Sequence, residues 1–383
     1  MSNWEWKKLG DVCDIYQPQT ISAKELVENG KYLVYGANGV IGRYDKYNHN
    51  DSEILLTCRG ATCGSINVSE PFSWINGNAM VVHPKNDSIT KSYLKLTLAL
   101  LDFSHIITGT AQPQITRTSL SPAIIPVPQL AEQKRIVKTL DEKFAKIDKI
   151  KTAAETNLKN ARELFNAELN SKLNVENENL PQGWETKSLN EITTIRPPKN
   201  RIIEKLKSSD MVSFLPMEDL NIRERNISAL KKKCLSEVQG SYTAFADGDV
   251  LLAKVTPCFE NGKLGIANNL SNGVGFGSSE YIVFRCDNSL LNVYLFYVLM
   301  SPSFVDGGKK KMLGACGLKR LSKDYVENFQ IPLPPLSEQK RIVAHLDKLS
   351  EKVKRLEEIY RRTIADCEEL KKSILKKTFE GES

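Results

Sequence analysis

A Glu-x-Lys triplet occurs twice in this sequence, and it is the first pattern that could support chemistry. The copies are Glu132-Gln-Lys134 and Glu338-Gln-Lys340. Together with an acidic residue upstream, such a triplet can hold Mg²⁺ in nucleases. Each copy, however, stands at the start of a predicted helix, directly after a proline-rich segment. We therefore interpret both as helix starts that form a surface for docking a partner, with the docking residues Glu132, Gln133, Arg135, Glu338, Gln339 and Arg341.

Glycine-rich loops that bind nucleotides have one weak candidate, Gly273-x-Gly275-x-Gly277. A dinucleotide-binding loop follows a strand and opens a helix. The residues after Gly277 are Ser-Ser-Glu-Tyr-Ile-Val-Phe, which favour a strand instead. The sequence also has no GxxxxGK[ST] phosphate loop, so ATP hydrolysis by the chain itself is not expected. We predict that this chain binds no cofactor.

Metal chemistry has no candidate cluster either. The eight cysteines include no CxxC pair, and the four histidines are scattered. Zinc sites need such ligands at short spacing, so we expect reduced thiols of a cytosolic protein and no metal. The first residues lack the apolar core of a signal peptide, and the apolar stretch at 94–101 is too short to span a bilayer. We therefore expect a soluble, cytoplasmic protein.

The length and the charge set broad limits on organisation and partners. A chain of 383 residues is too long for one ordinary core and predicts about two globular units. Lys and Arg total 53 against 46 Asp and Glu, a formal charge of +7. This mild basic excess permits a polyanionic partner without requiring one.

An internal repeat organises the chain. Residues 4–12 match residues 184–192, residues 51–56 resemble residues 247–252, and residues 125–137 match residues 331–343. The second copy is the longer one between its markers. Because the ends of the copies agree and the middles diverge, we interpret them as two similar frames that carry two different working surfaces.

Each copy has the patterns of a mixed α and β domain. Short apolar runs with β-branched residues predict strands at 53–57, 79–83, 250–253 and 281–284, separated by Gly- and Asn-containing turns. Short helices are predicted at 91–101 and 291–300.

A long helix is predicted after each proline-rich segment. Apolar residues at 3–4 spacing run through 131–173 and 337–379 without a Pro or Gly, and Ser337 is the predicted N-cap of the second helix. Each run is about 40 residues, or roughly 60 Å at 1.5 Å per residue. We predict that the two apolar stripes pair with each other in antiparallel fashion, which would put one globular unit at each end; the alternative is a seam for another subunit.

These segments, in this order, resemble the specificity subunit of type I restriction-modification systems. The opener Trp-Glu-x-x-x-Leu-Gly-Asp-Val, the doubled junction with identical residues at 132–137 and 338–343, and the ending at 372–381 carry the resemblance, which covers essentially the whole chain. It implies an α+β protein with two target-recognition domains joined by two long antiparallel coiled-coil helices, pseudo-two-fold symmetric. The expected segments are a first recognition domain at 1–129, a central helix at 130–175, a second recognition domain at 176–335 and a C-terminal helix at 336–383.

The resemblance also implies a function and partners. Each recognition domain would read one half of a split, asymmetric site on double-stranded DNA, and the helices would set the spacer. Two methyltransferase subunits would dock on the chain and methylate adenine with S-adenosylmethionine, and restriction and translocation subunits that use ATP and Mg²⁺ would complete the nuclease. The chain itself would be no enzyme.

DNA contacts would then come from basic and amide side chains of the globular units. Arg pairs bidentately with guanine and Gln with adenine, while phosphate contacts supply affinity. Any one of these residues can equally be part of a solvated basic surface. The candidates are Arg43, Arg59, Gln112, Gln114 and Arg117 in the first unit, and Arg223, Arg225, Lys254, Lys309, Lys310, Lys311, Lys319 and Arg320 in the second.

Two other functions stay open from the residues alone. A self-contained DNA-modifying enzyme is one, although an adenine methyltransferase should carry a Pro-Pro-aromatic motif, and the strings at 196–199 and 334–336 do not fit it. A coiled-coil adaptor that never touches DNA is the other.

Overall fold

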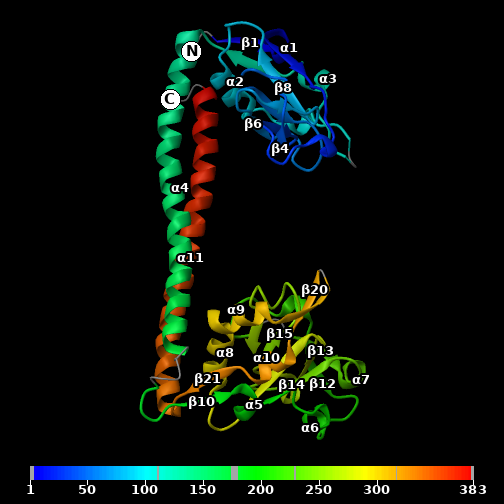
Figure 1. Cartoon of the computed structure of the whole chain (residues 1–383), viewed down its shortest axis with the longest axis vertical. Helices are drawn as coiled ribbons and strands as arrows, with labels where there is room; N and C mark the ends of the chain where they lie inside the picture. Colours follow the sequence, from blue (N-terminus) through cyan, green and yellow to red (C-terminus); the bar gives the residue numbers. More distant parts are fainter. Residues whose placement is uncertain (1–3, 110–111, 174–179, 228–229, 316, 381–383) are drawn as a thin grey trace. The chain divides into compact units, whose positions relative to one another are not determined.

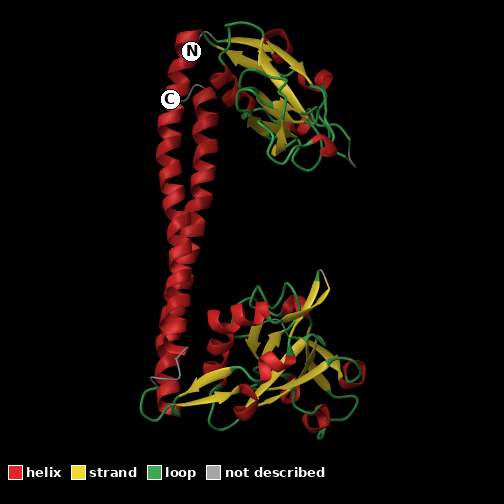
Figure 2. Cartoon of the chain, in the orientation of Figure 1, coloured by secondary structure: helices red, strands yellow, loops and turns green. Residues whose placement is uncertain are grey.

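A computed structural model describes residues 4–109, 112–173, 180–227, 230–315 and 317–380. The chain divides into two units, which are described separately: Met1–Ala154 with Arg362–Ser383, and Glu155–Arg361. Figure 1 labels the elements and Figure 2 shows that each globular part combines strands with short helices. Among the described residues, no helix is both long and apolar enough to cross a membrane.

The first unit contains a four-stranded antiparallel sheet and a three-stranded sheet. The order of the first is β2-β8-β5-β6, and that of the second is β4-β3-β7, with β3 and β7 parallel. Short helices α1, α2 and α3 complete the domain. The bounds are α1 (Leu9–Val12), β2 (Cys13–Tyr16), β3 (Tyr32–Gly36), β4 (Gly39–Tyr44), β5 (Ile54–Thr57), β6 (Ile66–Val68), β7 (Trp74–Ile75), β8 (Ala79–Pro84), α2 (Lys91–Leu98) and α3 (Arg117–Leu120).

The second unit repeats this plan and extends it. The sheet β11-β18-β15-β16 has the same order and antiparallel pairing as β2-β8-β5-β6, and β12 and β17 are parallel like β3 and β7. The extra length supplies further strands and the separate hairpin β19–β20. The bounds are α5 (Leu189–Ile192), β11 (Thr193–Ile195), α6 (Lys199–Ile203), β12 (Met211–Leu215), β13 (Lys231–Cys234), α7 (Leu235–Val238), β14 (Thr243–Ala246), β15 (Val250–Ala253), β16 (Leu264–Ile266), β17 (Val274–Gly277), β18 (Tyr281–Cys286), α8 (Asn292–Met300), α9 (Pro302–Lys310), β19 (Met312–Ala315), β20 (Leu318–Leu321) and α10 (Lys323–Glu327).

The repeated openers and junctions pair with each other inside each unit. Strand β1 (Glu5–Lys8) runs antiparallel to β9 (Ile124–Val127), and β10 (Glu185–Ser188) runs antiparallel to β21 (Gln330–Leu333). Prolines are tolerated in these two-stranded ribbons because each strand has a free edge. The pairing explains why the opener and the junction repeat together.

The resembling segments before β5 and β15 each bury an acidic residue. Glu53 is 4% exposed and its carboxylate contacts His83 at 2.8 Å, while Asp249 is 1% exposed and contacts Arg285 at 2.8 Å. Both partners lie on the next strand of the sheet. A buried carboxylate needs such a partner to be tolerated, so the repeated acid is a structural feature of the frame.

The two long helices, α4 (Leu130–Leu173) and α11 (Leu336–Glu380), pack side by side (Figure 1). In the first unit Lys151 pairs with Glu368 and Asp148 with Lys371; in the second, Arg162 pairs with Glu357 at 2.9 Å. From Asp148 to Arg162 the residue numbers increase along α4, while those of their partners in α11 decrease from 371 to 357. The two helices therefore run antiparallel. The apolar stripe lies largely in this contact, with Leu140, Ile147, Ala154, Phe165, Leu346, Val353 and Cys367 buried.

These observations confirm the mixed α and β class, the two mixed domains and the paired long helices. Three details of the helices differ from expectation. Leu356 and Leu370 belong to the predicted stripe but are 38% and 49% exposed. Ser337 is not the N-cap, because α11 already begins at Leu336 and the Pro335 carbonyl accepts hydrogen bonds from the amides of Glu338 and Gln339.

Candidate nucleic-acid interface

Two loops meet at corresponding positions in the two units. In the first unit the Gly60 amide donates to the Pro113 carbonyl at 3.1 Å, and the Ile115 amide donates to the Cys58 carbonyl at 3.0 Å. In the second unit the Thr256 amide donates to Lys319 at 2.9 Å, and the Leu321 amide donates to Lys254 at 2.8 Å. We call each meeting point a loop pair: residues 58–60 with 108–109 and 112–115 in the first unit, and residues 254–256 with 312–315 and 317–321 in the second.

Further features establish the correspondence of the loop pairs. The first loop of each pair directly follows the strand β5 or β15. The second loop leads into a short helix whose N-cap is Thr116 in the first unit and Ser322 in the second. Gln114 and Arg320 both stand two residues before these caps, and each makes an isolated β-bridge, with Arg59 and Val255 respectively. The same framework therefore presents Gln114 in one unit and Arg320 in the other.

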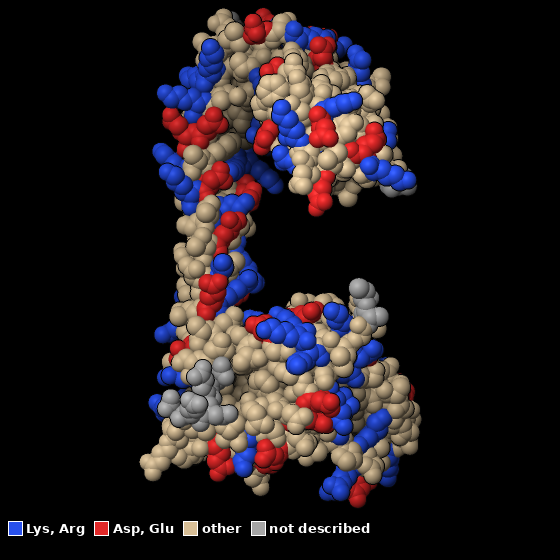
Figure 3. Space-filling model, viewed as in Figure 1, with Lys and Arg blue, Asp and Glu red and all other residues tan. Residues whose placement is uncertain are grey.

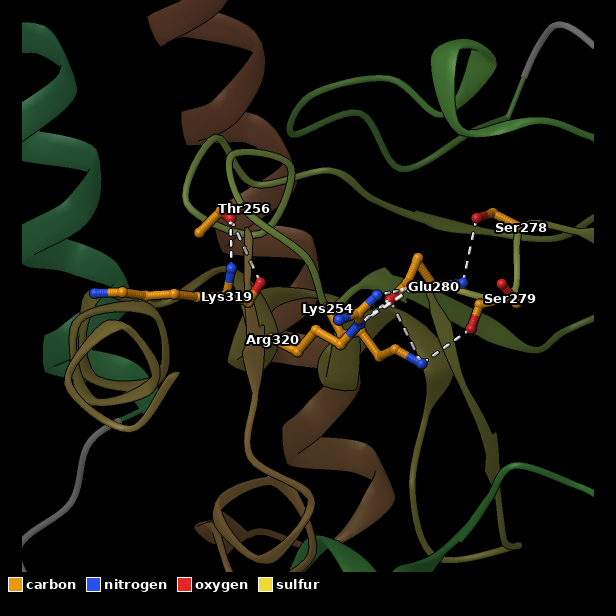
Figure 4. Close-up of polar contacts among 7 residues, drawn as sticks. All are labelled: Lys254, Thr256, Ser278, Ser279, Glu280, Lys319 and Arg320. Carbon is orange, nitrogen blue, oxygen red and sulfur yellow. Dashed lines mark hydrogen bonds and ion pairs between the residues drawn. The ribbon is translucent and has the colours of Figure 1, made fainter. Parts of the chain in front are cut away.

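In the second unit the loop pair carries a charged cluster (Figure 4). Glu280 lies against both cations: its carboxylate accepts from Arg320 Nη2 at 2.8 Å and Nε at 3.0 Å, and Lys254 Nζ is 3.7 Å away. Lys254 Nζ also donates to the Ser279 carbonyl at 2.9 Å. The side chain of Lys319 extends away from this cluster, while its amide donates to the Thr256 hydroxyl at 2.9 Å.

Burial and pairing shift the pKa values in this cluster. Hydrogen bonds from Arg320 lower the pKa of the Glu280 carboxyl below its usual value, with the charge of Lys254 acting in the same direction. Burial lowers the pKa of Lys254, although the Glu280 charge opposes that shift. Because Glu280 is ionised at neutral pH, it holds the Arg320 guanidinium by charge-assisted hydrogen bonds. The Arg320 side chain still has 47% of its surface exposed.

The first unit has an uncharged counterpart of this cluster. Cys58 occupies the position of Lys254, and its Sγ donates to the Asn78 carbonyl at 3.1 Å. Asn78 precedes β8 as Glu280 precedes β18, because Thr57 pairs with Ala79 and Ala253 pairs with Tyr281. The same framework therefore presents different side-chain chemistry in the two units.

The remaining predicted DNA-contacting residues fall into two groups. Arg59, Gln112, Arg117, Lys310, Lys311 and Lys319 are exposed. Arg43, Arg223 and Lys309 are exposed as well, but two of their side chains are also bonded within their own unit: Arg43 donates to the Gly30 carbonyl at 2.6 Å, and Lys309 pairs with Asp306 at 3.2 Å. Arg225 donates to Asp347 of α11 at 2.7 Å and so ties the globular part of the second unit to its helix.

Basic and acidic side chains are interspersed over the face drawn in Figure 3. The mild basic excess is therefore not gathered into one continuous patch on that face. The two loop pairs therefore differ from each other by the side chains at a few matching positions, such as Gln114 and Arg320, and not by a continuous basic surface.

The predicted docking residues also fall into two groups. Glu132 pairs with Arg135 at 2.7 Å, and Glu338 pairs with Arg341 at 2.6 Å, with both arginines exposed at the starts of α4 and α11. The Arg hydrogen bond lowers the pKa of each glutamate. The same motif thus presents the same ion pair on each unit.

Gln133 and Gln339 instead lie inside their units, and the docking prediction is corrected at these two positions. Both are 0% exposed. The Gln133 side chain accepts from the Thr90 amide at 2.9 Å and donates to the carbonyls of Ser88 and Pro128 at 2.8 and 2.9 Å. Gln339 makes the matching bonds to Leu291, Ser289 and Pro334. These amides lock the helix start to the domain and leave no polar atom for a partner.

The other chemical patterns have structural explanations among the described residues. Gly275 and Gly277 lie in β17, where an added Cβ would come within 2.1 Å of Phe245 and 2.5 Å of the Leu215 carbonyl. Close packing accounts for these glycines. In the described ranges, no group of three or more His, Cys, Asp or Glu side chains is placed to hold a metal ion.

Sequence reasoning missed Glu280 and Asn78. Glu280 lies 40 positions from Arg320 along the chain, and only the fold brings them together. The available signal was weak: each residue directly precedes a predicted buried strand.

Comparison with known proteins agrees with this architecture. Residues 1–160 and 181–361 match the family described as type I restriction modification DNA specificity domain. The chain is 42% identical over 171 residues to the type I restriction enzyme EcoEI specificity subunit of Escherichia coli, a match that covers 44% of this chain and 28% of that protein. It is 37% identical over 180 residues to the EcoAI specificity subunit of the same species, covering 47% and 30%. The chain thus spans less than a third of these two relatives.

A third relative matches along most of both chains. The putative type I restriction enzyme specificity subunit S.HindORF215P of Haemophilus influenzae is 24% identical over 364 residues, covering 91% of this chain and 88% of the relative.

Solved structures share the fold. A chain from a study of complex assembly and conformational transition of the type I R-M system superposes with a TM-score of 0.72 and 21% identity, covering 99% of this chain and 98% of that one. The HsdS subunit from Thermoanaerobacter tengcongensis gives a TM-score of 0.51 and 20% identity, with 99% and 97% covered. By its two matched segments, the chain belongs to the family of type I restriction-modification DNA specificity domains and carries two copies of that domain.

Proposed function

We propose that this chain is the DNA specificity subunit of a type I restriction-modification complex and has no catalytic site of its own. Each recognition domain, expected at 1–129 and 176–335, reads one half of a bipartite, asymmetric target on double-stranded DNA. The observation that supports this most directly is the pair of equivalent loop pairs, which carry Gln114 in one unit and Arg320 in the other. Identical readers would favour a symmetric target, whereas different side chains on one framework favour an asymmetric one.

The proposed partners carry the chemistry. Two methyltransferase subunits, which use S-adenosylmethionine, dock on the helices at 130–175 and 336–383, and the exposed ion pairs Glu132–Arg135 and Glu338–Arg341 contribute to that surface. Restriction and translocation subunits supply the use of ATP and Mg²⁺. Because its target is chromosomal or invading DNA, the complex works in the cytoplasm.

Selection from random duplex DNA tests the proposal. The full chain, with a methyltransferase partner, should enrich two short sequences at a fixed separation, and binding should weaken steeply as salt rises. Failure to enrich any sequence across low salt would favour the adaptor function instead. Isothermal calorimetry of the chain alone with S-adenosylmethionine or Mg²⁺ should give no binding heat, whereas a saturable heat would favour a self-contained enzyme.

We further propose that the long helices set the spacer of the target. Four residues inserted at matched levels of both helices add about 6 Å of helix. Since base pairs rise about 3.4 Å, the spacer should grow by about two base pairs. Selection by the lengthened chain that returned the original spacer would count against this role.

A further inference from the structure

The loop pairs show which side chains are set to distinguish the two half-sites. Arg320 and Gln114 occupy the same position, two residues before the N-cap of a short helix and in a bridge to the loop after β15 or β5. Arginine matches the O6 and N7 atoms of guanine in the major groove with two donors, and glutamine, like asparagine, matches the N6 and N7 atoms of adenine with one acceptor and one donor.

The contacts of Arg320 leave one edge of its guanidinium for a ligand. Glu280 holds the Nε and Nη2 side of the group, at 3.0 and 2.8 Å. Within the ranges that the structure describes, no protein hydrogen bond or ion pair is found at Nη1. The edge formed by Nη1 and the second Nη2 hydrogen therefore keeps the fork that guanine O6 and N7 accept from.

The surroundings hold this fork in place before DNA arrives. The Glu280 side chain is 25% exposed, and the residue directly precedes β18. Its backbone amide donates a hydrogen bond to the Ser278 hydroxyl at 3.2 Å, which restrains its backbone. Lys254, 18% exposed, balances the charge of Glu280 at 3.7 Å. An arginine held in one orientation loses less conformational entropy on binding than a free one, which favours a specific base contact over a diffuse phosphate contact.

Gln114 is fixed through its backbone alone. Its amide donates to the Thr108 carbonyl at 2.9 Å and its carbonyl accepts from the Thr108 amide at 2.8 Å. Its side chain is partly exposed, and among the described residues no hydrogen bond of its amide group is found.

We propose that Arg320, positioned by Glu280, reads a guanine in the half-site of the second unit, and that Gln114 reads an adenine in the half-site of the first. This assignment rests on the proposed function. It names Arg320 and Gln114 as base-reading residues and Glu280 as a positioning residue.

Selection from a duplex library with a random segment, using the full chain and a methyltransferase partner, tests both assignments. Arg320→Lys keeps the charge but loses the planar fork. It should reduce the preference for one G·C pair in one half-site by about 10- to 100-fold while leaving the other half-site unchanged. Gln114→Ala should relax one A·T pair in the opposite half-site. Each variant therefore carries a folding control, the half-site that it does not touch.

The Glu280→Gln variant tests whether Glu280 orients the Arg320 guanidinium for base reading or only stabilises the fold. Removing a negative charge beside DNA should strengthen binding to unrelated duplex, yet the same G·C pair should lose discrimination because the fork is no longer held. Equal weakening for all sequences, with an unchanged base profile, would overturn the positioning role.

The outcomes separate this inference from the function on which it rests. If the wild-type chain selects no bipartite sequence, both fail. If it selects one but Arg320→Lys changes neither half-site, or relaxes an A·T pair, the guanine assignment fails alone; an unchanged profile for Gln114→Ala refutes the adenine assignment.

Discussion

Two buried glutamines show what the repeated junction does at the scale of single residues. Gln133 and Gln339 each make three hydrogen bonds from a fully buried amide. The sequence showed that these positions repeat but not why, because a glutamine in the first turn of a helix is normally exposed. Only the fold, which brings the loop before α2 or α8 over the helix start, turns a docking candidate into an internal lock.

Gln133→Ala should destabilise the first unit by about 2–4 kcal/mol. The substitution leaves the buried Pro128 carbonyl and the partly buried Thr90 amide and Ser88 carbonyl without their partner, and each such group is costly. Urea denaturation combined with hydrogen exchange should show earlier opening of the first unit alone. Glu132→Gln is the matched control, since it removes only an exposed ion pair; equal stability of the two variants would contradict the lock.

Cysteine reactivity should report on burial in both units. Burial raises the pKa of Cys13 to about 12 and that of Cys286 to about 12. Because the thiolate is the reactive form, iodoacetamide at pH 8 should alkylate both about 1,000-fold more slowly in the folded protein than in urea. The rate should rise about tenfold per pH unit above pH 9, since the folded thiols are still far from half ionised there. Peptide mass spectrometry that found equal rates in folded and unfolded protein would refute this.

At the scale of elements, periodicity predicted most of the fold. The long helices, four central strands and two short helices follow from patterns that burial imposes on sequence. The hairpin β19–β20 and the second sheet of each unit were not predicted in detail. In the second sheets, some strands pair with segments far away in the chain, as β3 does with β7 and β12 does with β17, and no local pattern encodes such a partner.

The antiparallel register of the helices predicts a charge-swap result. Arg162→Glu places a second carboxylate opposite Glu357, and Glu357→Arg places a second guanidinium opposite Arg162. Each should lower the stability of the second unit by only about 0.5–1 kcal/mol, because the pair is partly exposed. The double variant should recover part of the loss by restoring the pair with reversed charges, but not all of it, because Glu357→Arg also removes the ion pair with Arg361 at 2.9 Å. High salt should shrink the differences.

Lys159→Glu is the control for this cycle. Lys159 pairs with Glu163 on the same helix at 3.7 Å, and both are well exposed. Its effect should simply add to that of Glu357→Arg. If Arg162→Glu and Glu357→Arg also only add, the register is wrong.

At the scale of the whole molecule, duplication explains how one chain carries two domains with the same framework and different side chains at the loop pairs. The frame repeats through the opener, the buried acid and the junction, and these were predictable because burial constrains them. The side chains at the loop pairs were only candidates, since nothing in a single sequence says which exposed Arg or Gln faces a ligand. The matching backbone hydrogen bonds and strand registers of the two copies provide the missing comparison.

The end of α11 should matter to the first unit only. Leu375 is buried in its core, and Phe379 packs against Trp4 and Tyr93 with ring centroids 6.1 and 5.5 Å apart. Leu375→Ala with Phe379→Ala should cost the first unit several kcal/mol, by loss of buried apolar contact. Hydrogen exchange should increase in Met1–Ala154 and stay unchanged around Trp184. Lys377→Ala, on the exposed side of the same turn, is the control, and uniform exchange in both units would disprove the assignment.

The discontinuous first unit has a consequence for biosynthesis. Its sheets leave the ribosome early, but Leu375 and Phe379, which close its core, are translated only after the entire second unit. The nascent first unit must therefore leave part of its apolar core exposed until the end of α11 has been made. The second unit, although its synthesis starts later, has all of its residues earlier and can finish folding first. Chaperone capture of stalled chains should be strongest while that part of the core is uncovered.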